Sequence, residues 1–462
     1  MAAPNSTSTL RREIGIWGAM FLGLGSMAGT GVFVSLGLGA DLVGPAVLLA
    51  VTVAALVATC NGLSSAQLAA NHPVSGGTYE YGYRYLHPRL GFLAGWMFLI
   101  AKSASAATAA LGFGGYFLHF FKIENNEWIL PLAIFAIFFM TVFVFWGIRQ
   151  TKTVNTLIVS VTLLALFLYI IVMFQPSLTA GTSNLSPFFA PEELTWQGKI
   201  AAFLEAVALM FVAYTGYGRI ATLGEEVHQP RTTIPKAIIL TLVVTWLLYS
   251  AVAAVSVASS GSNQYALASI QAIAPLEVLA FEQGHPIIAR LVAFGAITAM
   301  LGVLINLILG LSRVLLAMGR RQDMPRFLAT IEPTSGTPRW ATVVVAFLVG
   351  GLVLMQDIRA TWSLSAFAVL IYYSVTNLAA LRLKPKERFF PAWISLAGLI
   401  ACFILAFWVD RTIWISGLIW LAVGLLWFEI ASRMSKFSPP ETEMTPNASP
   451  RKRQKRKQQR RR

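Results

Sequence analysis

The sequence predicts an all-α membrane protein with about twelve transmembrane helices, and three observations predict it. Apolar residues make up 56% of the chain, charged residues make up only 12%, and the mean hydropathy is +0.67, which excludes a soluble domain. Apolar windows of about 20 residues, long enough to cross a bilayer, recur along the chain. Two of these windows carry glycines and hydroxyls at mid-depth, where an uninterrupted spanning helix needs neither.

The apolar windows place the expected spans at residues 14–38, 43–69, 90–121, 128–147, 154–174, 200–224, 236–259, 286–314, 340–356, 360–381, 389–408 and 412–432. They divide the chain into a cytoplasmic N-terminus (1–13), a first repeat of five spans (14–174), a second repeat of five spans (200–381), two further spans (389–432) and a disordered basic tail (438–462). Lysine and arginine concentrate on one side of these spans. The positive-inside rule therefore predicts a multi-pass protein of the plasma (inner) membrane with both termini in the cytoplasm.

The first span is interrupted at its centre, where Gly25 to Phe33 contains three glycines and two hydroxyls. Glycine costs about 1 kcal/mol relative to alanine in a helix, and in hydrocarbon the freed backbone groups find no water. Such a break survives where it lines a cavity, because the half-helix ends direct N–H and C=O groups at a bound zwitterion. The alternative is a packing face of small residues through Gly25 and Gly29.

A second interruption occurs in the sixth span, between Phe211 and Gly218, where glycines again meet a hydroxyl at mid-depth. The continuation to Gly224 is too short to cross a bilayer by itself. Two interrupted helices five spans apart are typical of an inverted repeat, with spans 1 to 5 and 6 to 10 as its halves. Matching breaks are harder to explain by helix packing than a single one.

The tail from 438 to 462 ends in a run of arginine and lysine, and its polar composition predicts disorder. Beside the inner leaflet it could contact anionic lipid, at about 1 kcal/mol per cation. The alternative is a tail that only orients the last helix. No nucleic acid partner is expected, because the tail is tethered to a membrane protein. Cys60 and Cys402 fall within spans, so no disulfide or metal site is expected, and no motif indicates a cofactor.

Four motifs carry a resemblance to a known family, in the right order and on the right side of the membrane. They are Gly25–Phe33 in the first span, Pro73–Tyr81 after the second, Glu225, Glu226, Pro230, Arg231 and Pro235 after the sixth, and Ser312, Arg313, Leu315, Ala317 and Met318 at the end of the eighth. The chain resembles the amino acid-polyamine-organocation (APC) superfamily of transporters. The resemblance implies the LeuT-type 5+5 inverted-repeat fold with discontinuous helices 1 and 6, and secondary transport of amino acids by alternating access.

The resemblance also implies where a substrate binds. The family's binding positions fall on Ser26, Gly29, Thr30, Gly31, Ala213, Thr215 and Gly216. Backbone N–H groups near Thr30 and Gly31 would receive the carboxylate, and carbonyls near Ala213 and Tyr214 would take the ammonium. Tyr214 and Tyr217 are expected to supply occluding lids.

Four further residues are candidates for coupling or gating. Thr162 stands where proton-coupled relatives carry a lysine, and with Thr298 it would ligate sodium unless both hydroxyls bond their own helices. Lys102 lies two turns inside the third span, where an ammonium costs at least ~2.5 kcal/mol. It is either a proton site, a stand-in for a sodium ion, or a snorkelling side chain. Arg219 comes directly after the second interruption and would pair with a substrate carboxylate or close an inner gate.

The balance of embedded charge favours a neutral or acidic amino acid as substrate, because the deep acids are only Glu205 and Glu429 whereas Lys102 and Arg219 are embedded cations. The sequence has no nucleotide-binding glycine loop and no catalytic constellation, so an enzyme is not expected. Transport would be coupled to a proton or sodium gradient or to exchange. A polyamine or cationic amino acid exchanger and a non-transporting amino-acid sensor on the same fold remain open.

Overall fold

The computed structural model describes residues 14–73, 76–146, 152–189, 191, 193–222, 227–332 and 337–437. The predicted N-terminus and basic tail lie outside the described residues, as do residues 74, 75, 225 and 226 of the family motifs. Within the described chain the structure is helical, and its strand-like pairing is a single isolated bridge between Ile14 and Val227. The predicted all-α class is therefore confirmed.

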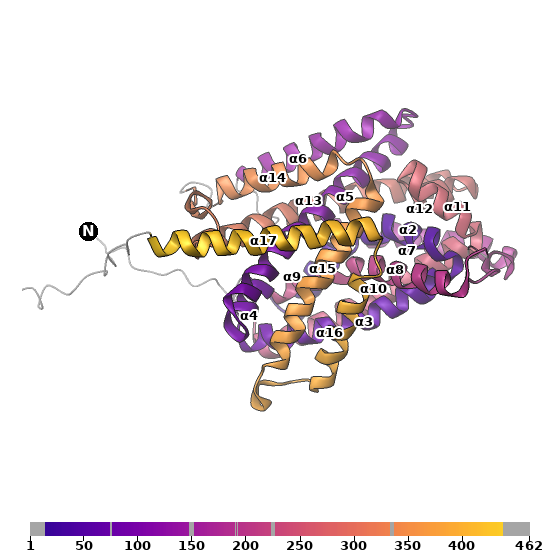
Figure 1. The fold of residues 1–462 in the computed structure, drawn as a ribbon. Coiled ribbons are helices and arrows are strands. Elements are labelled where there is room, and N and C mark those ends of the chain that lie inside the picture. The colour runs from indigo at the N-terminus through magenta and orange to yellow at the C-terminus, as the bar shows by residue number, and fades with distance from the viewer. Residues whose placement is uncertain are drawn as a thin grey trace, which may run out of the picture.

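The helices form one elongated bundle in which most axes run roughly along a common direction (Figure 1). In chain order they are α1 (Ile16–Met27), α2 (Leu36–Val43), α3 (Val47–Asn71), α4 (Thr78–Tyr85), α5 (Pro88–Phe121), α6 (Ile129–Phe145), α7 (Lys152–Ala180), α8 (Trp196–Tyr214), α9 (Gly218–Ala221), α10 (Pro230–Ser260), α11 (Ser262–Leu267), α12 (Pro275–Glu282), α13 (Pro286–Arg320), α14 (Arg339–Val353), α15 (Ile358–Leu381), α16 (Ala392–Ala406) and α17 (Arg411–Phe437).

Nine helical segments of the described chain are long and apolar enough to cross a membrane, and α1, α14 and α16 are shorter apolar helices. The twelve-span count and the internal repeat stay predictions. Local chemistry sets several helix ends: α5, α10 and α13 begin at prolines, and the Asp357 side chain accepts from the N–H of Ala360 at the start of α15. Gly44, at φ 62°, and Pro45 turn the chain between α2 and α3.

The centre of the bundle is α5, which packs against α13 and α15. Between Ala101 and Ala110 it presents a nearly unbroken series of buried small residues, so neighbouring helices approach closely. Two hydrogen bonds cross to α15: Ser105 to Ser365 at 2.7 Å and Thr108 to Thr361 at 2.9 Å. By contrast α17 lies along the outside of the bundle (Figure 1), with 11% of its apolar window buried.

The short helix α4, which carries the end of the second family motif, is held against the end of α13 by the buried side chain of Asp323. The hydroxyls of Tyr79 and Tyr83 both donate to Asp323 Oδ2 at 2.6 Å. Burial, with Asp323 alongside, raises the pKa of both phenols far above the usual range, so both remain donors. Arg321 lies over the Tyr83 ring, 4.4 Å from its centroid. The loop between α3 and α5 is thereby tied to the end of α13.

Candidate functional site

The first helix is interrupted between α1 and a wide π-helical turn at Gly31–Ser35 that leads into α2. Ala28 leaves the helical region at ψ 60°, and the N–H of Gly29 turns back to Met27 O. The ladder then continues from the N–H groups of Val32 and Phe33, which both donate to Gly29 O at 3.2 Å. The predicted discontinuity of helix 1 is therefore present.

Glycine is needed at this interruption because neighbouring helices come very close. A β-carbon on Gly29 would lie 2.5 Å from Val303 Cγ2 of α13. A β-carbon on Gly31 would lie 2.6 Å from the Tyr249 hydroxyl and 2.8 Å from Ala213 Cβ. Each distance is shorter than real side-chain contacts allow. The glycines therefore allow α13, α10 and α8 to surround the break.

The second interruption is a tight 3₁₀ turn at Thr215–Tyr217, between α8 and the four-residue α9. The Thr215 hydroxyl donates to Val212 O at 2.7 Å and accepts from Lys102 Nζ at 2.9 Å. At Gly216 a β-carbon would lie 2.7 Å from the carbonyl carbon and oxygen of Ser26. The two interruptions therefore touch through their backbones.

Tyr249 of α10 connects the two interruptions. Its hydroxyl lies 2.7 Å from Met27 O and 3.2 Å from Ala213 O, so its one proton is shared between a carbonyl of each break, with the shorter contact at Met27. Sequence reasoning missed this residue. A tyrosine at mid-depth of a predicted span was the available signal, because its hydroxyl requires a partner in hydrocarbon.

A cavity of about 40 Å³ lies between the interruptions. One water needs roughly 10–15 Å³, so the cavity has room for a few water-sized groups. Its lining comes from α1, α5, α8, α13, α15 and the two breaks, and consists of Ser26, Met27, Thr30, Gly31, Lys102, Ser105, Val212, Ala213, Thr215, Val303, Leu307 and Trp362. Thr30 is 4% exposed, and its Oγ1 has no hydrogen-bond partner among the described residues. An unpartnered buried hydroxyl in a cavity wall marks a place for a polar ligand.

Five of the predicted binding residues line this cavity: Ser26, Thr30, Gly31, Ala213 and Thr215. Gly29 and Gly216 lie at the helix crossings just described. The two predicted lid tyrosines do not belong to the described lining. Tyr214 donates to Val51 O at 3.2 Å, and the Tyr217 ring packs against that of Tyr373, with centroids 5.5 Å apart.

The structure places the coupling candidates in different surroundings. Lys102 points into the cavity instead of snorkelling to the interface. The hydroxyl of Thr162 donates to Ile158 O at 2.9 Å, and that of Thr298 lies 3.1 and 3.0 Å from the carbonyl oxygens of residues 294 and 295. Both threonines thus bond their own helices. Arg219 is half-buried on α9.

Sequence reasoning also missed the apolar half of the wall, which consists of Val212, Val303, Leu307 and Trp362. No local signal could have identified the three aliphatic residues, because apolar side chains at mid-span look alike whether they face lipid or a cavity. The Trp362 indole donates to Leu209 O at 3.0 Å, which fixes the ring between α15 and α8.

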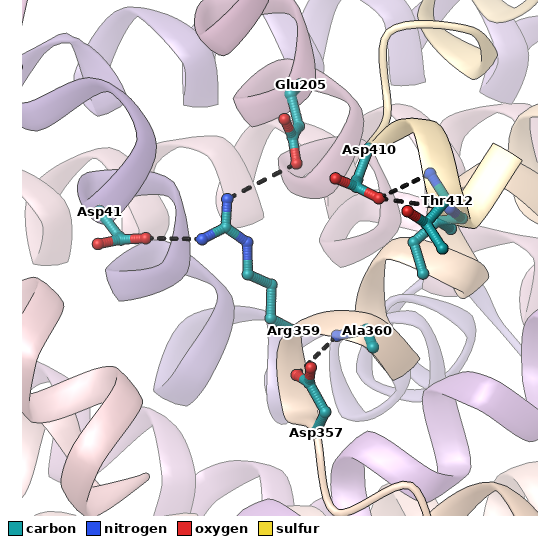
Figure 2. A network of polar contacts seen from close by, with 8 residues as sticks. Asp41, Glu205, Asp357, Arg359, Ala360, Asp410 and Thr412 are labelled. Carbon is teal, nitrogen blue, oxygen red and sulfur yellow. Dashed lines mark hydrogen bonds and ion pairs between the residues drawn. The ribbon is translucent and has the colours of Figure 1, made fainter.

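An ion-pair cluster lies one turn before Trp362 on α15 (Figure 2). Arg359 contacts Asp41 of α2 at 2.9 Å and Glu205 of α8 at 3.8 Å. Asp410 accepts from the backbone N–H of Thr412 at 2.9 Å and serves as a cap for α17. Through Arg359, the cluster joins both helices that carry the interruptions to α15, on the predicted outer side.

Paired helix interruptions around a polar cavity, within a bundle of apolar spanning helices, define a membrane transporter. A solved structure of a manganese transporter from Eremococcus coleocola has the same LeuT-type fold, with a TM-score of 0.57 at 12% identity over 92% of this chain and 98% of that one. The chain belongs to the amino acid permease family of the APC superfamily, whose model matches residues 18–438.

Sequence relatives agree with this assignment. An uncharacterized transporter of Mycobacterium tuberculosis is 38% identical over 416 residues, covering 90% of each chain. A branched-chain amino acid permease of Bacillus subtilis is 27% identical, covering 94% of this chain and 96% of the relative. The protein is therefore an integral multi-pass membrane protein and an amino acid transporter, not an enzyme.

Proposed function

We propose that the protein moves a neutral or acidic amino acid across the plasma membrane by alternating access, with both termini in the cytoplasm. The observation that carries the proposal is the unpartnered Thr30 hydroxyl in a cavity between two helix interruptions. A zwitterion supplies what this cavity lacks, because its carboxylate accepts from Thr30 and from the N–H groups at the start of the helical run that leads into α2.

Lys102 is the proposed coupling residue. Its ammonium lies at the C-terminal end of α8, where the helix dipole is negative, and it bonds Thr215 directly. In its charged form it donates a charge-assisted hydrogen bond at the second interruption, and loss of the proton would weaken its bond to Thr215. The own-helix bonds of Thr162 and Thr298 support a proton at Lys102 over a sodium ion between those two hydroxyls.

Uptake by proteoliposomes containing the full-length protein tests this proposal. Labelled amino acids are offered with a pH gradient, with a sodium gradient, and with unlabelled amino acid trapped inside. We expect uptake driven by the pH gradient and no stimulation by sodium. Uptake that requires sodium would contradict the role of Lys102. Binding without transport under all three conditions would indicate a sensor.

A further inference from the structure

The lining of the cavity combines apolar side chains with a few polar groups and carries no acid. Val212, Val303, Leu307 and Trp362 belong to it, and among the described lining residues none bears a carboxylate. The nearest acid along α8 is Glu205, eight residues before Ala213 and therefore about 12 Å away along the axis. That acid is engaged with Arg359.

Most hydroxyl groups of the wall are already hydrogen-bonded within the protein. Ser26 donates to Leu22 O at 3.0 Å, Ser105 pairs with Ser365, and Thr215 donates to Val212 O. The Trp362 N–H is occupied as well. Among the side chains of the described lining, the donors left for a ligand are the Thr30 hydroxyl and the remaining protons of Lys102. With the backbone N–H groups at the first interruption they serve the carboxylate, so few side-chain donors remain for a polar side chain.

Charged side chains are disfavoured for two different reasons. A cationic side chain would share the cavity with Lys102 and find no counter-charge in the described lining. An acidic side chain would bring a second carboxylate, which would compete with the first for Thr30 and Lys102 while buried beside valine, leucine and tryptophan. A neutral aliphatic side chain meets neither penalty.

Two residues of α13 contribute apolar side chains to the cavity lining. Val303 and Leu307 are four residues apart and therefore lie on one face of that helix. Val303 also occupies the space where a β-carbon on Gly29 would lie, so it reaches the first interruption itself. The cavity is small, about 40 Å³ by the measure in which one water takes roughly 10–15 Å³, so long side chains are disfavoured.

Resting on the proposed function, we infer that the site selects a small neutral amino acid with a short aliphatic side chain, from alanine to valine. Val303 and Leu307 set the upper limit of its size. A misfit of one methylene in an apolar pocket changes specificity about tenfold or more. The affinity for an amino acid should therefore fall steeply when its side chain is larger than that of valine.

The test is competition for labelled alanine uptake by the full-length protein in proteoliposomes. We expect unlabelled alanine and valine to compete well, and phenylalanine, lysine and glutamate to compete at least about tenfold more weakly. Val303→Ala and Leu307→Ala should each raise the competition by leucine relative to alanine about tenfold. Leu291→Ala is the matched control, because Leu291 lies on α13 but is 42% exposed on the surface of the bundle.

Each outcome decides the inference. Equal competition by lysine or glutamate would overturn the inferred substrate class and leave amino acid transport intact. An unchanged leucine-to-alanine ratio in both α13 variants would overturn the size limit. Failure of every amino acid to be taken up would overturn the proposed function and this inference with it. If the variants do not fold, thermal stabilisation of the unmodified protein by the same amino acids gives the selectivity directly.

Discussion

The two helix interruptions occupy corresponding places in the predicted repeats, yet the polar groups at each interruption find different hydrogen-bond partners. At the first, a wide π-helical turn leaves the Thr30 hydroxyl without a partner among the described residues. At the second, a tight 3₁₀ turn is closed by the protein's own ammonium through the Lys102–Thr215 bond. One break is thus open to a ligand, whereas the other already holds a cation.

The two breaks therefore present opposite partial charges to the cavity. The helical run that begins at the first break presents its positive end, and α8 presents its negative end at the second. In the proposed function Lys102 partly neutralises that second end, so a substrate would be oriented mainly by its carboxylate at the first. In the further inference Val303 and Leu307 of α13 would then limit the side chain that the zwitterion can carry.

The largest expected effect comes from removing the cation at the second interruption. Lys102→Ala should abolish uptake driven by a pH gradient, because the proposed proton carrier is lost. Lys122→Asn is the control, since Lys122 is an exposed lysine at the end of the same helix in a left-handed conformation that asparagine accepts. Uptake in proteoliposomes measures both variants. A wild-type rate in Lys102→Ala would remove this residue from the mechanism.

Adding a methyl group where the two interruptions cross should be nearly as severe. Gly216→Ala would place a β-carbon 2.7 Å from the Ser26 carbonyl, so the backbones must separate. We expect at least tenfold slower transport and destabilisation of about 1–3 kcal/mol. Gly351→Ala, in α14, has no atom within 4 Å of its new β-carbon and should be neutral or slightly stabilising. If Gly216→Ala and Gly351→Ala unfold at the same temperature and transport at the same rate, the close crossing at Gly216 is contradicted.

Removing the free hydroxyl at the first interruption tests the carboxylate site. Thr30→Val should raise the KM for uptake about tenfold, because a hydrogen bond to a charged group contributes roughly 1.5–3 kcal/mol. Thr30→Ser keeps the hydroxyl and should retain most of the affinity. Coupling to the pH gradient should be unchanged in both variants. A KM unaffected by Thr30→Val would place the carboxylate elsewhere.

Tyr249→Phe probes the side chain that joins the interruptions. The change removes this donor from the carbonyl oxygens of Met27 and Ala213. Met27 O keeps the N–H of Gly29, so the expected cost is that of one lost hydrogen bond, about 0.5–1.5 kcal/mol. We expect a lower thermal unfolding midpoint with amino acid selectivity retained. Tyr265→Phe is a useful comparison, since this buried tyrosine of α11 lies outside the cavity lining. If both variants unfold like the unmodified protein, the bridging role of Tyr249 is wrong.

The smallest effect is expected from the outer cluster. Arg359→Gln removes contacts to α2 and α8, but the arginine side chain is 41% exposed, so solvent screens the pairs. A loss of about 0.2–1 kcal/mol in stability is expected, and it should shrink in high salt. Unfolding measured at low and high ionic strength checks this. A large loss that is independent of salt would show that the cluster is sealed from water.

The sequence by itself determined the class of fold and the position of both interruptions. Hydropathy over a span and the presence of glycine beside hydroxyls are local properties, and the bilayer acts on them wherever the helices pack. The individual residues at the breaks, from Ser26 to Gly31 and from Ala213 to Thr215, were site candidates because the resemblance to the APC superfamily implied them. Most of them line the cavity.

Only the tertiary structure decided which distant side chains meet those breaks. The rotation of each helix about its axis is set by packing, and the sequence does not specify it residue by residue. Lys102 could have reached the interface but bonds Thr215, whereas Thr162 bonds its own helix. Val303 and Leu307 resemble any lipid-facing pair in sequence, and they line the cavity because α13 turns that face inward.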